Sequence, residues 1–330
     1  MDEKQHPDSI WTWKTSARSK KACLWIPYLH KLERIKGGWC IQYNGGEVET
    51  KLKDVDCIML YGASGELPLP FLDELSNKKI SLLIHRRNLA DPYVFTPNPK
   101  RDEPDVLTAQ VLARNNQTKS AYVARSLIRE RFKSFGFPVA PHTFKQLASC
   151  RSVAEVRNIE ALQTRQYWIR YFEKLGETDL SRRAASPISA ALDAGSFFLY
   201  GIILRWLLLH KFSPAHGFLH ITSGYPSLAY DLMEPYRYII EDAVLKAHEE
   251  GAEDLTAATF NNMKKSLDTT VYVPSHRCSV RRKNLLHGVV LALRAWLLGE
   301  DKRLVLPCEG ERIGGRRPQT GYKLPGASLN

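Results

Sequence analysis

Three acidic residues and one histidine, placed in separate regions of the sequence, could together bind a metal ion. His220 ends the segment Gly217-Phe218-Leu219-His220, and Asp231 and Glu234 follow shortly after it, whereas Glu160 lies well before them. An imidazole and carboxylates from different segments can hold a hard divalent cation and leave positions open for phosphate and water. The pattern therefore predicts Mg²⁺ or Mn²⁺, and the nitrogen donor suits Mn²⁺ better than Ca²⁺.

Glu160 falls within the segment 153–175, in which apolar residues recur at helical spacing. Val156 and Leu162 are expected on the apolar face, with Glu160 beside it. A carboxylate in that place costs free energy unless it is paired or binds a metal ion. Glu160 is thus predicted to be either a metal ligand or a hydrogen-bond partner of a neighbour such as Thr164.

The segment after His220 is predicted to begin a helix that Ser227 caps. Asp231, Glu234 and Arg237 then follow along one side of that helix. The alternative for such a helix is a solvated acidic face, on which Arg237 pairs with Glu234 or Glu241.

Composition favours a two-domain protein with an anionic partner. The chain has 330 residues and a formal net charge of +12 at pH 7, which indicates nucleic acid or an anionic membrane surface. Membrane insertion is not expected, because the apolar run 197–209 contains Arg205 and is shorter than the ~20 residues that span a bilayer. No secretory signal and no Cys-x-x-Cys pair is evident, so a cytoplasmic protein with reduced cysteines is expected.

The order of predicted elements indicates an α+β multidomain fold. A small β-rich N-terminal domain is expected over residues 1–91, a linker over 92–105 and an α-helical domain over 106–330, with a flexible basic tail from about residue 310. The predicted strands are 23–26, 39–43, 55–61 and 80–84, with a short helix at 70–75. The predicted helices of the second domain are 106–132, 153–175, 188–210, 227–248 and 285–298.

Clusters of basic residues are candidates for contacts with the DNA backbone, since such contacts need charge more than sequence. The clusters are Arg182 with Arg183, then Arg277, Arg281, Arg282 and Lys283, and finally Arg316 with Arg317. Solvated surface charge is the alternative for each of them. Four tryptophans of the N-terminal domain could stack on unpaired bases, but packing in the core or in a dimer is the expected role; they are Trp11, Trp13, Trp25 and Trp39.

Several segments taken together resemble the CRISPR-associated integrase family, the endonuclease subunit that inserts new spacers into CRISPR arrays. The resemblance rests on Ile159-Glu160, Tyr167-Trp168, Arg182-Arg183 before Ser186-Pro187-Ile188, Gly217 to His220, and Ser227 to Arg237. It covers essentially the whole chain and keeps the order glutamate, histidine, acid.

The resemblance implies a role for each residue of the predicted site. Glu160, His220 and Glu234 match the metal-binding positions of the family, Asp231 matches its accessory acid, and Arg237 a position that is usually basic. The implied reaction is metal-dependent transesterification, in which the 3′-hydroxyl of a DNA fragment attacks the target strand. With water as the nucleophile, the same site would cleave DNA.

The resemblance also implies partners. These are a second copy of the chain bound through the N-terminal domain, a small ferredoxin-like partner subunit, donor duplex DNA, and the leader-end repeat of the CRISPR array as target, in the service of antiviral defence. Two other functions remain open from the residues alone: a standalone structure-selective DNA nuclease, and a non-catalytic DNA-binding scaffold whose acids only pair with arginines.

Overall fold

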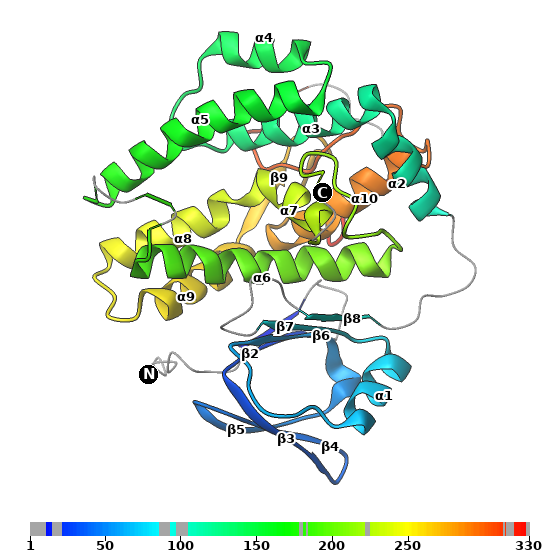
Figure 1. The fold of residues 1–330 in the computed structure, drawn as a ribbon, viewed down its shortest axis with the longest axis vertical. Coiled ribbons are helices and arrows are strands. Elements are labelled where there is room, and N and C mark those ends of the chain that lie inside the picture. Colours follow the sequence, from blue (N-terminus) through cyan, green and yellow to red (C-terminus); the bar gives the residue numbers. More distant parts are fainter. Residues whose placement is uncertain are drawn as a thin grey trace. The chain divides into compact units, whose positions relative to one another are not determined.

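The computed structural model of the protein describes residues 11–14, 22–85, 93–96, 105–177, 181–182, 184–221, 225–312, 314 and 320–327. Contacts divide the chain into two compact units, 1–103 and 104–330. The first unit is rich in strands and the second is mostly helical (Figure 1), which confirms the predicted α+β class.

The first unit contains a five-stranded mixed sheet in the order β1-β2-β6-β7-β8. Its strands are β1 (Trp11–Lys14), β2 (Ala22–Pro27), β6 (Val55–Tyr61), β7 (Ser81–His85) and β8 (Tyr93–Phe95). The central strands β2, β6 and β7 are parallel, and α1 (Leu69–Lys78) makes the crossover that a parallel β6–β7 pair needs. Strand β8 pairs with β7 and lies inside the segment that was predicted to be linker.

A second, antiparallel sheet completes the first unit. Its strands are β3 (Leu29–Ile35), β4 (Gly38–Tyr43) and β5 (Gly46–Thr50), and the 3₁₀ turn η1 (Leu52–Asp54) leads on to β6. Side chains from both sheets and from α1, among them Ile58, Ile41 and Phe71, form one apolar core. Trp25 and Trp39 are both buried, so the prediction that they pack in the core is confirmed.

The second unit is a helical assembly with one β-hairpin. Its helices are α2 (Val106–Asn115), α3 (Gln117–Lys133), α4 (Pro141–Ser149), α5 (Val153–Lys174), α6 (Pro187–Leu209), α7 (Ser227–Met233), α8 (Tyr238–Glu249), α9 (Leu255–Asp268) and α10 (Lys283–Leu297). The 3₁₀ turn η2 (Glu234–Tyr236) lies between α7 and α8, and β9 (Thr270–Val273) pairs with β10 (Cys278–Arg281). The helices predicted at 153–175, 188–210 and 285–298 are therefore confirmed.

Two segments that were each predicted to be one continuous helix are interrupted in the structure. The segment 106–132 forms two helices because Asn116 caps α3, its side chain accepting a hydrogen bond from the Lys119 N–H at 3.0 Å. The segment 227–248 is divided into α7, η2 and α8. Pro235 lies at the break, where it has no N–H to continue the helical ladder.

Helix α6 contacts four other helices of the second unit, α7, α8, α9 and α10 (Figure 1). By length and composition α6 is apolar enough to cross a membrane. The argument against a membrane span from the apolar run 197–209 considered only part of this helix. However, 78% of its apolar window is buried within the fold, as expected for the core helix of a folded domain.

A partly buried histidine pair between the end of α6 and α10 makes stability depend on pH. The His287 ring stacks on Trp206 with centroids 3.5 Å apart, and its Nε2 lies 2.9 Å from Nε2 of His210. Burial, assisted by His210 and Arg205, lowers the pKa of His287 to about 2. In the unfolded chain, the His287 imidazole binds a proton near pH 6.5, whereas in the folded protein it stays neutral at that pH. The free energy of unfolding therefore decreases as the pH falls below 6.5.

We expect His287 to reduce the free energy of unfolding by up to about 2 kcal/mol between pH 6.5 and pH 5. Urea unfolding at both pH values would measure this loss, and His287→Gln should remove most of it. His142, which is exposed on α4, provides the control, because His142→Gln should leave the pH dependence unchanged. An unaltered pH dependence in His287→Gln would contradict the expectation.

Candidate active site

Glu160 lies on the buried side of α5, between Val156 and Tyr167. Leu162, expected on that side, is 66% exposed, so the apolar face is rotated from the predicted one toward Glu160. Glu160 Oε1 accepts a hydrogen bond from Thr164 Oγ1 at 2.8 Å, the alternative that the sequence left open. Burial raises the pKa of Glu160 by more than this hydrogen bond lowers it. A cation beside the carboxyl would compensate the charge that burial disfavours.

Asp231 on α7 holds the loop that carries His220. Its carboxylate accepts hydrogen bonds from the backbone N–H groups of Phe218, Leu219 and His220 at 2.5, 2.8 and 3.0 Å. Its Oδ1 also lies 2.7 Å from Nδ1 of the His220 ring. One buried carboxylate therefore fixes both the backbone of the loop and the orientation of the imidazole.

Ser227 and Gly217 complete this arrangement. Pro226, not Ser227, occupies the N-cap of α7, so the predicted cap was wrong. The Ser227 hydroxyl instead accepts a hydrogen bond from the Gly217 N–H at 3.0 Å and donates one to the Ala215 carbonyl at 3.1 Å. A side chain at Gly217 would place its Cβ 2.7 Å from Asp231 Oδ2, so only glycine allows the loop to approach this closely.

The role of Asp231 thus differs from that of an acid facing the substrate. It is fully buried, and both of its oxygens are already engaged. Because Nδ1 of His220 donates to Asp231, Nε2 remains as the nitrogen that can bind a metal ion. Burial disfavours the protonated imidazole, but Asp231 outweighs this effect and raises the pKa of His220. Asp231 is therefore a positioning residue.

Glu234 is the first residue of η2 and is buried, with 7% of its surface exposed. Its Oε1 accepts a hydrogen bond from Arg237 Nε at 2.8 Å, and its Oε2 lies 3.9 Å from Arg131 Nε. Burial opposes ionisation, but Arg237 and Arg131 outweigh it and hold the pKa of Glu234 below its usual value. The predicted pairing of Arg237 with Glu234 is confirmed, although on a buried rather than a solvated face.

A buried ionic network lies behind Glu234, and the sequence pattern did not predict it. Arg131 on α3 is 2% exposed and donates two hydrogen bonds to Glu241 on α8, at 2.9 and 2.5 Å. The Tyr167 hydroxyl donates to the same carboxylate at 2.6 Å, and the Tyr171 hydroxyl to the Glu241 backbone carbonyl at 2.8 Å. The only sequence signal was a charged residue among the apolar side chains of the predicted helix 106–132.

One cavity of about 740 Å³ brings the candidate residues together. Glu160, His220 and Glu234 line it, together with Arg131 and Arg237, whereas Asp231 does not. The positive charges on His220 and Arg237 favour the ionised form of both glutamates, although burial keeps the pKa of Glu160 raised, so the groups act on one another electrostatically. Residues from α5, the 217–220 loop and η2 thus converge as predicted.

The donor set suits a hard divalent cation, because two carboxylates and one imidazole nitrogen are ligands that Mg²⁺ and Mn²⁺ accept. In the described part of the chain, however, no group of three or more His, Cys, Asp or Glu side chains is arranged to hold a metal ion. Glu160 and Glu234 are hydrogen bonded to Thr164 and Arg237 instead. Binding would require both carboxylates to exchange these partners for the cation, and the metal assignment stays a prediction.

The basic residues proposed for DNA contact have different environments. Arg182 lines the same cavity, pairs with Asp193 and lies over the Trp168 ring at 5.6 Å from its centroid, while Arg183 lies outside the described residues. Arg316 and Arg317 are also outside them.

The cluster from Arg277 to Lys283 is mostly compensated. Lys283 is buried 2.6 Å from Asp268, which also pairs with Arg281 at 3.3 Å, and Arg282 pairs with Glu309 at 2.9 Å. The Arg277 guanidinium donates to the Gly314 carbonyl. These contacts favour a structural role for the cluster.

Residues 140–270 match the profile of the family described as "CRISPR associated protein Cas1". A CRISPR-associated endonuclease Cas1 of Pyrobaculum aerophilum is 34% identical over 105 residues, which are 32% of this chain and 36% of that protein. Its counterpart from Thermus thermophilus is 32% identical over 93 residues, 26% of this chain and 28% of that protein. The chain thus spans about a third of these relatives' length. The residues that match the family profile include Glu160, His220 and Glu234.

Solved structures resemble a larger part of the chain. A casposase bound to its integration product aligns with a TM-score of 0.75 and 21% identity, over 89% of this chain and 96% of that one. A Cas1 protein from Thermotoga maritima aligns with a TM-score of 0.68 and 17% identity, over 83% and 96%. A Cas6-RT-Cas1–Cas2 complex gives a TM-score of 0.69 and 14% identity, over 93% of this chain and 37% of that one. At these identities the likeness establishes the fold.

Proposed function

Because this chain belongs to the CRISPR-associated Cas1 family, we propose that it is a metal-dependent DNA endonuclease and integrase that inserts fragments into a CRISPR array. The observation that carries the proposal is the cavity in which Glu160, His220 and Glu234 meet Arg131 and Arg237. Acidic metal ligands beside fixed positive charges suit a reaction at a phosphodiester.

The metal ion, Mg²⁺ or Mn²⁺, would be held by Glu160, His220 Nε2 and Glu234, and would supply Lewis-acid activation of the phosphodiester. Arg237, which donates a hydrogen bond to Glu234, would bind a non-bridging phosphate oxygen, and Asp231 keeps His220 in one orientation and one tautomer. Positioning of this kind supplies much of the catalysis of phosphoryl transfer.

In the joining reaction, the 3′-oxygen of the donor attacks phosphorus in the target strand. A new phosphodiester bond forms, the bond to the target's own 3′-oxygen breaks, and the proton lost by the donor hydroxyl is balanced by the one that the leaving oxygen gains. The number of phosphodiester bonds does not change, so no external energy source is needed. Attack by water instead yields cleavage.

The partners follow from the same proposal. The proposed DNA substrates are a donor duplex and the leader-end repeat. The casposase of similar fold, which was solved bound to its integration product, supports DNA as the substrate class. The Cas1–Cas2 assembly among the similar structures supports a small ferredoxin-like partner subunit. We also propose a homodimer formed through the β-rich N-terminal domain, and a cytoplasmic protein.

The deciding experiment supplies a labelled donor duplex and a supercoiled target to the purified chain, with and without the partner subunit. We expect joined products only when Mn²⁺ or Mg²⁺ is present and the donor has a free 3′-hydroxyl, since a 3′-deoxy donor has no nucleophile. Cleavage without joining would instead identify a structure-selective nuclease. DNA binding without any metal-dependent reaction would identify a scaffold.

A further inference from the structure

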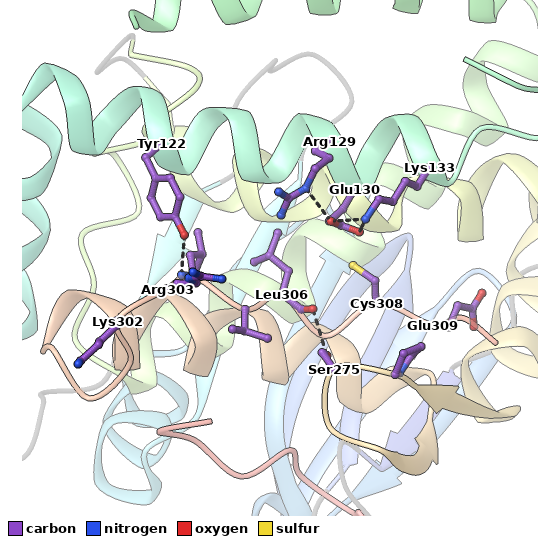
Figure 2. A pocket seen from close by; sticks show the side chains of 13 residues that line it. Tyr122, Arg129, Glu130, Lys133, Ser275, Lys302, Arg303, Leu306, Cys308 and Glu309 are labelled. Carbon is purple, nitrogen blue, oxygen red and sulfur yellow. Dashed lines mark hydrogen bonds and ion pairs between the residues drawn. The ribbon is translucent and has the colours of Figure 1, made fainter. Parts of the chain in front are cut away.

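A second cavity, of about 710 Å³, lies in the helical unit between α3 and the segment 302–309 (Figure 2). Tyr122, Arg129, Glu130 and Lys133 of α3 form one wall, and the turn at Ser275 lies beside the opposite wall. Its lining shares no residue with the candidate active site. Neither the metal chemistry nor the arginines of that site involve it.

The rim of this cavity carries excess positive charge. Arg129 and Lys133 are exposed on α3, where Glu130 compensates them at 3.1 and 3.0 Å. Lys302 and Arg303 are exposed on the other wall and have no acidic partner within the part of the chain that the structure describes. These two cations are therefore available to an anion from outside.

The floor of the cavity is mostly apolar, with the Glu130 carboxylate beside the Cys308 thiol. Leu304 and Leu306 are buried beneath the rim, and burial raises the pKa of the Cys308 thiol well above its usual range, so the thiol stays neutral. The Tyr122 hydroxyl accepts a hydrogen bond from the Leu304 N–H at 3.0 Å, which leaves its own proton free to donate to a ligand. A basic rim over an apolar floor suits a ligand that combines phosphate with a sugar or a base.

We propose that this cavity binds the sugar–phosphate backbone of one nucleic-acid strand, with phosphates on Lys302 and Arg303 and a sugar or base against the floor. Its volume is within the range of small-ligand sites. Long exposed cations on opposite walls, however, suit a polymer that passes along the rim and continues beyond it. The proposal rests on the proposed function only in taking DNA as that polymer.

The test is a charge reversal on the rim, with a matched reversal elsewhere. The variant is Lys302→Glu with Arg303→Glu, and the control is Lys145→Glu with Arg151→Glu, which changes the net charge equally at exposed positions of α4 and the turn after it. Binding of a fluorescent single-stranded oligonucleotide is followed by anisotropy over a range of salt concentrations. Lys302→Gln with Arg303→Gln provides a milder pair in case the reversal perturbs folding, which thermal unfolding would reveal.

We expect the rim variant to bind about tenfold more weakly than the wild type, and the control to bind within about twofold. The slope of log K against log salt should fall by about 1.4, as expected for two lost phosphate contacts at about 0.7 each. Equal binding by rim variant and wild type, or an equal loss in the control, would overturn the proposal. Displacement of the oligonucleotide by a deoxynucleoside monophosphate at equal phosphate concentration would also overturn it, and would assign the cavity to a free nucleotide.

A strand-joining assay on the wild type and on the rim variant separates this proposal from the function of the active site. If the wild type joins no DNA and the rim variant still loses binding, the strand site stands and the integrase proposal fails. If the wild type joins DNA and the rim variant binds the oligonucleotide normally, the integrase proposal stands and the strand site fails.

Discussion

Glu160→Gln is expected to lower the rate of metal-dependent strand joining by about 10²–10³-fold while leaving the fold at least as stable as the wild type. Glutamine keeps the shape of the side chain and can still accept the hydrogen bond from Thr164. It removes the negative charge that a cation requires. Burial raises the pKa of Glu160. At a pH above the ordinary titration range of a glutamate, the ionised carboxylate therefore reduces the free energy of unfolding. Glutamine has no charge and avoids this loss.

Single-turnover joining assays and urea unfolding at pH 8 measure the two halves of this prediction. Glu253→Gln, at an exposed position before α9, is the matched control and should change neither quantity. Calorimetric titration with Mn²⁺ should show weaker binding in Glu160→Gln alone. Full joining activity in the folded variant would remove Glu160 from the ligand set, and a large loss of stability would show that its role is structural.

The sequence pattern indicated that Glu160, His220 and Glu234 lie together, but not how they are held. All three line one cavity, whereas their roles as metal ligands stay predictions. The position of Asp231 was not, because helical spacing shows which side of α7 it occupies and not that three backbone N–H groups of a distant loop converge on it. Contacts between backbone and side chain that are remote in sequence leave no periodic pattern.

The same limit applies to the fold. Long periodic segments such as α5, α6 and α10 were predicted within two residues, since burial of one face or of the whole helix determines their composition. The hairpin of β9 and β10 was missed, because its strands are four residues each and too short to display an alternation. The break at Asn116 depends on a single capping hydrogen bond, and the apolar pattern continues across it.

The Arg131–Glu241 pair also connects the fold to the site. Arg131 lies between Glu241, which it binds through two hydrogen bonds, and Glu234, which lines the cavity. The rings of Phe135 and Tyr167 lie 4.9 Å from its guanidinium carbon. A guanidinium held in this way fixes α3 against α8 and also supplies positive charge behind a predicted metal ligand.

Arg131→Met is therefore expected to lower the free energy of unfolding by about 3–5 kcal/mol, because it leaves Glu241 charged and buried without its partner. The neighbouring Arg129→Met removes an exposed ion pair with Glu130 and should cost no more than about 1 kcal/mol. Glu241→Gln keeps an acceptor for the Tyr167 hydroxyl, and combining it with Arg131→Met should cost less than the sum of the single changes, by about 1–3 kcal/mol. Strictly additive values from urea unfolding would mean that the pair is not coupled, and that α3 and α8 are held together by apolar packing alone.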